Sequence, residues 1–247
     1  MHLSKPFAAL SIVFFSFFGI LTPLVTPAHA AVPTGGLIAH WKFDEGSGTT
    51  AGDSAGTNTG TLVNGAQIVT TGQKVGTGAL SLDGVNDYVG ITGKILIDLI
   101  SGSTGSITAW IKPTGVAPTV TTADTGDAIF ADAAAGMGLF RAIIGGNDRI
   151  WAYNWDGNED RVGGTYVNDA WNFVGWTHAN GTLYITINGV IVSSIPSGNT
   201  TDLSTQPRIG LGYAGFNGYF TGLIDDVRVY NRALSAAEIQ RLYNLGH

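Results

Sequence analysis

Two aspartates stand side by side at positions 225 and 226, within the stretch LIDDVRVY. Adjacent carboxylates could form a catalytic pair, a cation site or structural contacts with nearby arginines. The apolar and β-branched residues around them predict a strand, in which successive side chains leave opposite faces of the sheet. We therefore expect that Asp225 and Asp226 do not converge on one substrate atom or one cation, which excludes a catalytic dyad in a regular strand.

A second group of oxygen-bearing side chains lies in the stretch WDGNEDR. Asp156, Asn158 and Asp160 have the spacing that opens an EF-hand calcium loop, but Arg161 and Val167 stand where that loop needs glycine and glutamate. An EF-hand is therefore excluded. Two interpretations stay open: a looser loop site for calcium or for sugar hydroxyls, and a polar turn between strands.

Aromatic residues form a regular row in the stretch RIWAYNW. Trp151, Tyr153 and Trp155 occupy alternate positions, so in a strand all three side chains share one face. Such a row could stack on the apolar faces of pyranose rings. It could equally belong to the core between two sheets, which is the commoner location of large aromatic residues.

A second aromatic group lies in the glycine-rich stretch GYAGFNGYF. It contains Tyr213, Phe216, Asn217 and Tyr219, and its glycines predict a loop. Exposed loop aromatics beside an amide side chain could contact a sugar or a protein. These four residues are therefore further candidates for ligand binding.

The elements that position these residues are predicted to be strands. SITAWIKP (106–113) alternates between two faces with a period of two. TLYITINGVIVSSI (182–195) consists of two β-branched runs around Asn188-Gly189, a pair that favours the type I′ turn of a hairpin. No helical stretch intervenes between strands, so we expect an antiparallel all-β jelly-roll sandwich.

The C-terminal region follows a different pattern. Ser235 and Glu238 have the spacing of a capping box, in which each side chain bonds to the backbone N–H of the other residue. Apolar residues at roughly helical spacing follow. The sequence therefore predicts a short C-terminal helix that docks on the sandwich.

The N-terminal 30 residues have the order of a secretory signal peptide. Lys5 precedes an apolar stretch at 7–25, and Ala28-His29-Ala30 matches a cleavage site. We expect cleavage there, which would leave residues 31–247 as one secreted domain; the alternative is an uncleaved membrane anchor. No second apolar run of that length follows, so no membrane span is expected after cleavage.

The composition limits the classes of partner. The formal net charge is −6, which opposes nucleic-acid binding because that function needs a basic surface. Charged residues make up only 12% of the chain and cysteine is absent, while glycine is abundant with 36 residues. This balance favours short strands joined by tight turns, stabilised by packing and without disulfides.

Several segments resemble a known family. They are LIAHWKFDEGSGTTAGDSAG, GTLVNGA, GTGALSLDGVNDYV, WNFVGWTHANGTLYITINGV and YFTGLIDDVRVYNRALSAAEIQRLY, which together run from Leu37 to Tyr243. They are similar to a laminin-G-like jelly-roll domain of the concanavalin A-like lectin/glucanase superfamily. The resemblance implies two antiparallel sheets packed face to face, one of them concave. It implies no single activity, because this fold hosts lectins, adhesins, glycosidases and lyases.

The resemblance also implies a structural calcium ion (Ca²⁺). In the glucanase branch, the first aspartate of a similar closing strand holds calcium, and the matching residue here is Asp225. Calcium takes six to eight oxygen ligands, and the stretch FDEGSGTTAGDSAG could supply Asp44 and backbone carbonyls. The alternative is that Asp225 caps a turn or pairs with Arg228 or Arg232. Asp226 is expected to pair with an arginine or to face solvent.

The resemblance also provides a test for catalysis. Glucanases of this fold carry two glutamates and an aspartate at alternating positions of one strand. Here the only glutamates are Glu45, Glu159 and Glu238, which are far apart in the sequence. His40 and His178 lie in apolar strands, where we expect hydrogen-bonded structural histidines. We therefore expect no catalytic residues.

These observations favour a secreted, non-catalytic glycan-binding module stabilised by one calcium ion. The ligand, a glycan or a glycosylated surface, would lie across the concave sheet or its edge loops. One alternative is a structural or adhesive protein that binds a protein partner or associates with itself. Another is an unusual polysaccharide hydrolase or lyase.

Overall fold

A computed structural model describes residues 31–92, 104–118, 126–132, 137–155, 159–198, 206–212 and 218–247. Contacts divide the chain into two units, Met1–Ala30 and Ala31–His247. The predicted signal segment, residues 1–30, lies outside the described residues.

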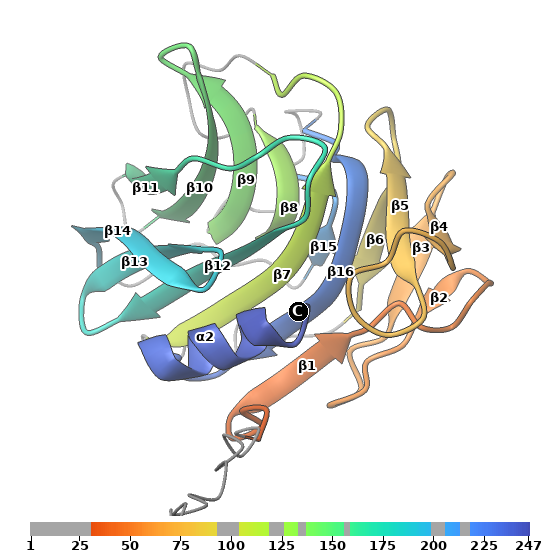
Figure 1. Ribbon diagram of the computed structural model, residues 1–247, viewed down its shortest axis with the longest axis horizontal. Helices are drawn as coiled ribbons and strands as arrows, with labels where there is room; N and C mark the ends of the chain where they lie inside the picture. The colour runs from red at the N-terminus through yellow and green to blue at the C-terminus, as the bar shows by residue number, and fades with distance from the viewer. Residues whose placement is uncertain are drawn as a thin grey trace, which may run out of the picture. The chain divides into compact units, whose positions relative to one another are not determined.

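Two antiparallel sheets make up the second unit. Sheet A contains, in spatial order, β14 (Val190–Pro196), β13 (Thr182–Ile187), β12 (Asn172–Ala179), β7 (Gly105–Pro113), β16 (Thr221–Tyr230), β5 (Ala79–Asp83) and β4 (Gln67–Val69), with β1 (Leu37–Trp41) also paired to β16. Sheet B contains β11 (Glu159–Gly164), β10 (Asn147–Trp155), β9 (Met137–Ile144), β8 (Asp127–Asp132), β15 (Pro207–Ile209), β6 (Tyr88–Ile91), β3 (Gly60–Val63) and β2 (Thr50–Ala51). Sheet A lies in front of sheet B in Figure 1. The predicted all-β, antiparallel architecture is confirmed.

The main core forms between the two sheets. In β7, Ile107, Ala109 and Ile111 point into this core, while Trp110 on the opposite face packs under the C-terminal helix. This is the two-residue alternation that the sequence predicted. Burial of apolar side chains from both sheets supplies the main driving force for folding.

The predicted hairpin is confirmed. β13 and β14 pair in antiparallel fashion on either side of Asn188 and Gly189, which have positive φ angles of 49° and 81°. A side chain on Gly189 would lie 3.0 Å from atoms of Gln240 and Tyr243. The positive φ and this close approach to the helix both favour glycine at position 189.

The helix α2 (Ala236–Asn244) begins as predicted. Ser235 is its N-cap, and both hydrogen bonds of the capping box with Glu238 are present. Ile239 and Leu242 are buried against the outer face of sheet A. Among the described residues, no helix has the length and apolar character that crossing a membrane would require.

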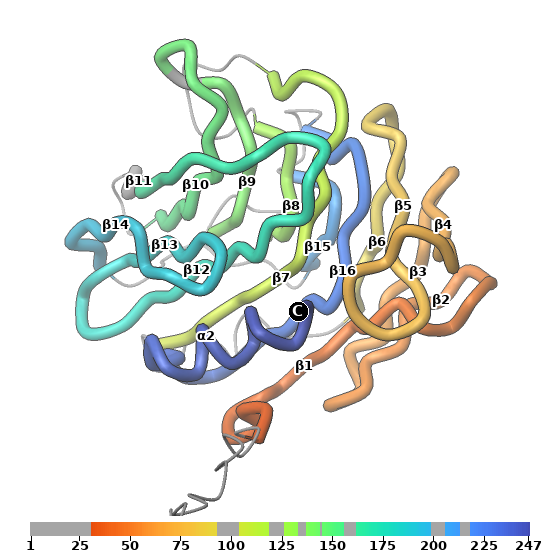
Figure 2. Tube along the Cα trace, viewed as in Figure 1, coloured from red at the N-terminus to blue at the C-terminus, as the bar shows by residue number. Residues whose placement is uncertain are grey.

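The chain passes from one sheet to the other between neighbouring strands, and it pairs strands that are far apart in the sequence. The stretch at 79–91 forms two strands in different sheets, β5 in sheet A and β6 in sheet B. β1, near the start of the described chain, pairs with β16 near its end, and the Cα trace shows the two running side by side (Figure 2). This second pairing places His40 beside the two adjacent aspartates.

Candidate functional site

The strand that carries Asp225 and Asp226 is not regular. The pairing register between β16 and β7 shifts between Asp225 and Arg228, and Asp226 has a φ of 50°. Both aspartates are buried and both line one cavity of about 480 Å³. The expectation that they leave opposite faces is therefore wrong, because a β-bulge with a left-handed residue interrupts the alternation on which it depends.

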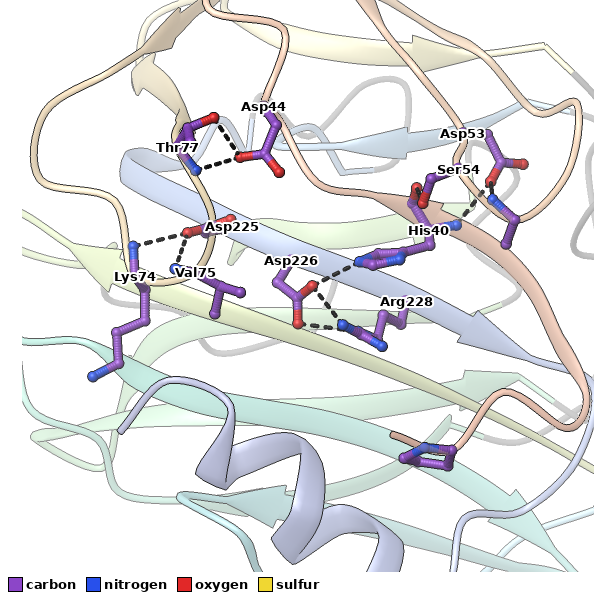
Figure 3. Close-up of polar contacts among 12 residues, drawn as sticks. His40, Asp44, Asp53, Ser54, Lys74, Val75, Thr77, Asp225, Asp226 and Arg228 are labelled. Carbon is purple, nitrogen blue, oxygen red and sulfur yellow. Dashed lines mark hydrogen bonds and ion pairs between the residues drawn. The ribbon is translucent and has the colours of Figure 1, made fainter. Parts of the chain in front are cut away.

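Asp226 lies at the centre of a buried ion-pair network. His40 Nε2 lies 2.6 Å from Asp226 Oδ1, and Arg228 donates from Nη2 to Oδ1 at 2.9 Å and from Nε to Oδ2 at 3.0 Å (Figure 3). Burial acts to raise the pKa of Asp226, but the hydrogen bond from His40 and the charge and hydrogen bonds of Arg228 outweigh it and lower the pKa. Asp226 therefore pairs with an arginine, as expected, and His40 has a structural hydrogen bond.

This network bears on the catalytic interpretation of the pair. Both oxygens of Asp226 are bonded within the chain. Asp225 and Asp226 therefore do not present two free carboxylates to a substrate, although the bulge brings both to one cavity. The dyad remains disfavoured, for a different reason from the one that the sequence suggested.

Asp225 is bound on one side only. The backbone N–H groups of Lys74 and Val75 both donate to its Oδ2 at 2.8 Å, while its Oδ1 has no hydrogen-bond partner among the described residues. Burial is the main reason that the pKa of Asp225 rises to about 7, and the negative charge of Asp226 adds to the rise. Asp225 thus caps a turn, which was one of the two alternatives.

Asp44 binds the other end of the same segment. Its Oδ1 accepts from the backbone N–H groups of Thr77 and Gly78 and from the Thr77 hydroxyl. Figure 3 shows Asp44 beside Thr77, and Asp225 beside Lys74 and Val75. Asp44 and Asp225, the two predicted metal ligands, therefore accept hydrogen bonds from the two ends of the same loop.

Whether this region can bind calcium depends on which of its oxygen atoms have no hydrogen-bond partner. No group of three or more His, Cys, Asp or Glu residues suited to a metal occurs in the described parts of the chain. A calcium ion here would rely on Asp44, Asp225, backbone carbonyls and water. The buried, unpartnered Oδ1 of Asp225 fits a cation, since an unpaired buried carboxylate oxygen is costly. Phe43, buried with a φ of 56°, adds backbone strain directly before Asp44.

The aromatic row lies on the outer face of sheet B. Ile150 and Ala152, which alternate with it along β10, belong to the core between the sheets. Trp151, Tyr153 and Trp155 therefore share the opposite face, as predicted, and do not contribute to the inter-sheet core. Tyr153 is 5% exposed, whereas Trp151 and Trp155 are half-buried.

Small residues let the aromatic rings lie flat on this face. Trp151 pairs with Gly163 of β11, and a side chain on Gly163 would come within 3.1 Å of the indole ring. The Phe140 ring similarly covers Gly138 and meets Tyr153 edge to face, with centroids 6.4 Å apart. The result is a layer of rings along β9 and β10.

Several predicted ligand-binding residues lie outside the described structure. These are Asp156, Asn158, Tyr213, Phe216 and Asn217.

Two further predicted ligand-binding residues are placed at least in part. Asp160 belongs to β11, where its backbone pairs with Asn154. Tyr219 is half-buried and forms an isolated bridge with Leu211. The roles predicted for all these residues stay predictions.

Comparison with known families now identifies the fold. The family model of the concanavalin A-like lectin/glucanases superfamily matches residues 82–240. The chain belongs to this superfamily. Its laminin-G-like character, which the sequence resemblance implied, is confirmed. A search of curated proteins found none that matches.

Solved structures of the same fold include two kinds of domain. Domain 4 of AbnA, an extracellular GH43 arabinanase from Geobacillus stearothermophilus, in complex with arabinotriose, has a TM-score of 0.58 and 21% identity over 85% of this chain and 98% of that chain. The binding domain of botulinum neurotoxin DC in complex with SialylT has a TM-score of 0.64 and 16% identity over 87% of this chain and 52% of that chain. The same toxin domain in complex with rat synaptotagmin II has a TM-score of 0.64 and 16% identity, over 88% and 53%.

These likenesses concern the fold. At identities of 16% to 21% they carry no residue roles to this chain. This chain spans about half the length of the toxin domains.

The glutamates of this superfamily member serve local structure where they are described. Glu45 accepts a hydrogen bond from the Gly52 backbone N–H, and Glu238 caps α2 and pairs with Arg232. Glu159 lies in β11, and its side chain is not described. Glu45 lies in a loop and Glu238 in the first turn of α2, so these two glutamates do not form a carboxylate pair.

Two features of this structure were not predicted from the sequence. The network of His40, Asp226 and Arg228 depends on a bulge and on the pairing of β1 with β16, neither of which has a signal in the sequence. Arg208 and Tyr88 form a cation–π contact on the outer face of sheet B. They are far apart in the chain, and only the strand order brings them together.

Proposed function

We propose that this chain is a secreted, non-catalytic carbohydrate-binding module. The observation that supports this most is the aromatic row of β10 on the outer face of sheet B. Trp151 and Trp155 are half-buried there, so each residue keeps part of its surface exposed outside the core. An accessible indole face can stack on the C–H face of a sugar ring, which a tryptophan inside the core cannot do.

Other observations favour the same function. Structures of this fold have been solved with arabinotriose and with SialylT. The net charge of −6 opposes nucleic acid as a partner. Secretion, as part of the proposal, rests on the signal-like order of residues 1–30. The other predicted loop residues would add hydrogen bonds to sugar hydroxyls.

We also propose a structural calcium ion at Asp44 and Asp225. The unpartnered Oδ1 of Asp225 and the strained backbone at Phe43 support this. When bound, calcium would supply positive charge that offsets the cost of burying the Asp225 carboxylate. It would act on stability, because the aromatic row belongs to a different sheet.

Affinity electrophoresis of the purified protein on a panel of neutral polysaccharides tests the glycan proposal. We expect retardation by at least one polysaccharide and its loss in Trp151→Ala and Trp155→Ala. Trp171→Ala is the matched control, because Trp171 is also half-buried but bonds to Gly72 O at another site. Retardation by no polysaccharide, or equal losses in all three variants with unchanged melting temperatures, would contradict the proposal.

One observation favours a second function, adhesion through protein contacts. β14 is an edge strand of sheet A, and Val190, Ile191 and Val192 are 57%, 39% and 47% exposed. An exposed apolar edge strand can pair with another chain. Light scattering against concentration tests this. Growth in size that Val192→Lys abolishes would support adhesion, and a constant monomer mass would exclude self-association.

A further inference from the structure

The outer face of sheet B carries an unpaired arginine. Arg208 lies in β15 beside Ile209, and because Ile209 belongs to the core, Arg208 points to the outer face. Arg141, Arg228 and Arg232 each bond to a carboxylate. The Arg208 side chain, in contrast, makes no hydrogen bond or ion pair with any residue of the described chain. Its charge is therefore left for solvent or a ligand.

An aromatic ring orients this cation. The Arg208 guanidinium carbon lies 5.8 Å from the centre of the Tyr88 ring in β6. Tyr88 is on the outer face because Val89, the next residue, is in the core. A cation–π contact at this distance restrains the planar guanidinium while its N–H edges stay free to donate.

The strand register places a small residue and a hydroxyl beside the cation. Arg208 pairs directly with Gly90, and Gly90 pairs directly with Thr61 of β3. A side chain added to Gly90 would meet only the Tyr88 ring, at 3.5 Å, and Thr61 is exposed. Arg208 and Thr61 are thus two strand spacings apart, about 10 Å, with a glycine between them. This leaves room for one sugar ring.

We infer that Arg208, Tyr88, Gly90 and Thr61 form a subsite for a sugar that bears a carboxylate, such as a uronic or a sialic acid. A guanidinium binds a carboxylate through two parallel N–H···O bonds, which a neutral sugar cannot accept in the same way. The sugar ring lies over Gly90, and the Thr61 hydroxyl bonds to a ring hydroxyl. The inference deepens the proposed glycan-binding function and rests on it.

The experiment compares acidic and neutral glycans with the same backbone. Calorimetry measures the affinity of the purified protein for polygalacturonate and its fully methyl-esterified form, and for sialyllactose and lactose. We expect an acidic member to bind about tenfold more tightly than its neutral partner, which corresponds to one charge-assisted contact. The pair that shows the preference identifies the source of the carboxylate.

Variants locate the preference. Arg208→Gln should remove the preference for the acidic glycan and leave the affinity for neutral glycans unchanged. Gly90→Val should weaken binding at this subsite, because the valine side chain would occupy the space proposed for the sugar ring. Arg241→Gln is the matched control, because Arg241 of α2 is exposed and has no carboxylate partner among the described residues. Melting temperatures verify that each variant folds.

The outcomes separate this inference from the proposed function. Equal affinity for the acidic and neutral glycans would overturn the acidic subsite, and so would a preference for the acidic glycan that survives in Arg208→Gln. Binding of the neutral glycans would in either case leave the glycan-binding proposal intact. An equal loss in Arg241→Gln would overturn it too, since the preference would then reflect overall charge. Binding of no glycan would refute both proposals.

Discussion

Two polar regions of this molecule differ in where their charges find partners. At the bulge of β16, Asp226 is bonded through both oxygens to His40 and Arg228, all within the chain. On the outer face of sheet B, the Arg208 side chain has a cation–π contact with Tyr88 and no hydrogen bond or ion pair among the described residues. The two regions therefore have different roles. Charges that are paired inside the chain stabilise the fold, and a charge without an internal partner is available to a ligand.

The strongest test of this comparison removes the centre of the buried network. Asp226→Ala should lower the free energy of unfolding by about 3–5 kcal/mol, because it leaves Arg228 buried without its carboxylate. Urea denaturation measures this loss. Asp148→Ala, at an exposed position, is the control and should cost little. A loss below about 1 kcal/mol for Asp226→Ala would show that the network does not hold the fold.

The same network predicts acid sensitivity. The pKa of Asp226 is lower in the folded chain than in the unfolded chain. Its contribution to stability is therefore complete above the unfolded value of about 4 and is lost as the pH falls through the lower folded value. Thermal melts between pH 5 and pH 2 should show this loss in the wild type and much less of it in Asp226→Ala.

Asp225 should behave in the opposite way. Its pKa rises to about 7 in the folded chain, so between about pH 4 and pH 7 the folded state binds more protons than the unfolded state. Stability in the presence of chelator should therefore fall as the pH rises through this window. Asp225→Asn should remove this slope, because the amide carries no charge and its oxygen can still accept from Lys74 and Val75.

The Asp225 variant also tests the proposed calcium ion. At pH 8, calcium should raise the melting temperature of the wild type and leave that of Asp225→Asn unchanged. Identical wild-type melts with calcium and with chelator would refute the metal site, while the pH slope would still test the buried carboxylate.

A smaller effect is expected at the helix cap. Glu238→Gln should cost about 0.5–1 kcal/mol, because glutamine can still accept from the Ser235 backbone N–H but loses the ion pair with Arg232. The pKa of Glu238 is lowered to about 2, mainly by its hydrogen bonds with Arg232, so this contribution is present above the unfolded value of about 4.3 and is lost toward pH 2. Melts at pH 7 and pH 2 should differ more for the wild type than for the variant. An equal difference in both proteins would assign the acid loss to other carboxylates.

The smallest effect is expected at Arg208. Arg208→Gln should change the free energy of unfolding by less than about 0.5 kcal/mol, since no described carboxylate loses a partner. Urea denaturation beside Asp226→Ala gives the direct contrast. A cost of several kcal/mol would mean that Arg208 also stabilises the fold, and the division between the two regions would fail.

The local elements were predictable because their causes are local. The Asn188-Gly189 turn, the capping box of Ser235 and Glu238, and the alternation along β7 each depend on residues close together in the chain. The shared face of Trp151, Tyr153 and Trp155 follows from the same two-residue period. The sequence alone therefore determined the fold class and the main strands around these residues.

Tertiary structure decided which surfaces these elements present. Whether the β10 aromatics face the core or the outside depends on which side of the strand meets sheet A. The bulge that turns Asp225 and Asp226 to one side, and the register that places Arg208 beside Gly90, depend on pairing between strands far apart in the chain. Such pairing arises from the sum of many distant contacts, and no short stretch of sequence contains that information.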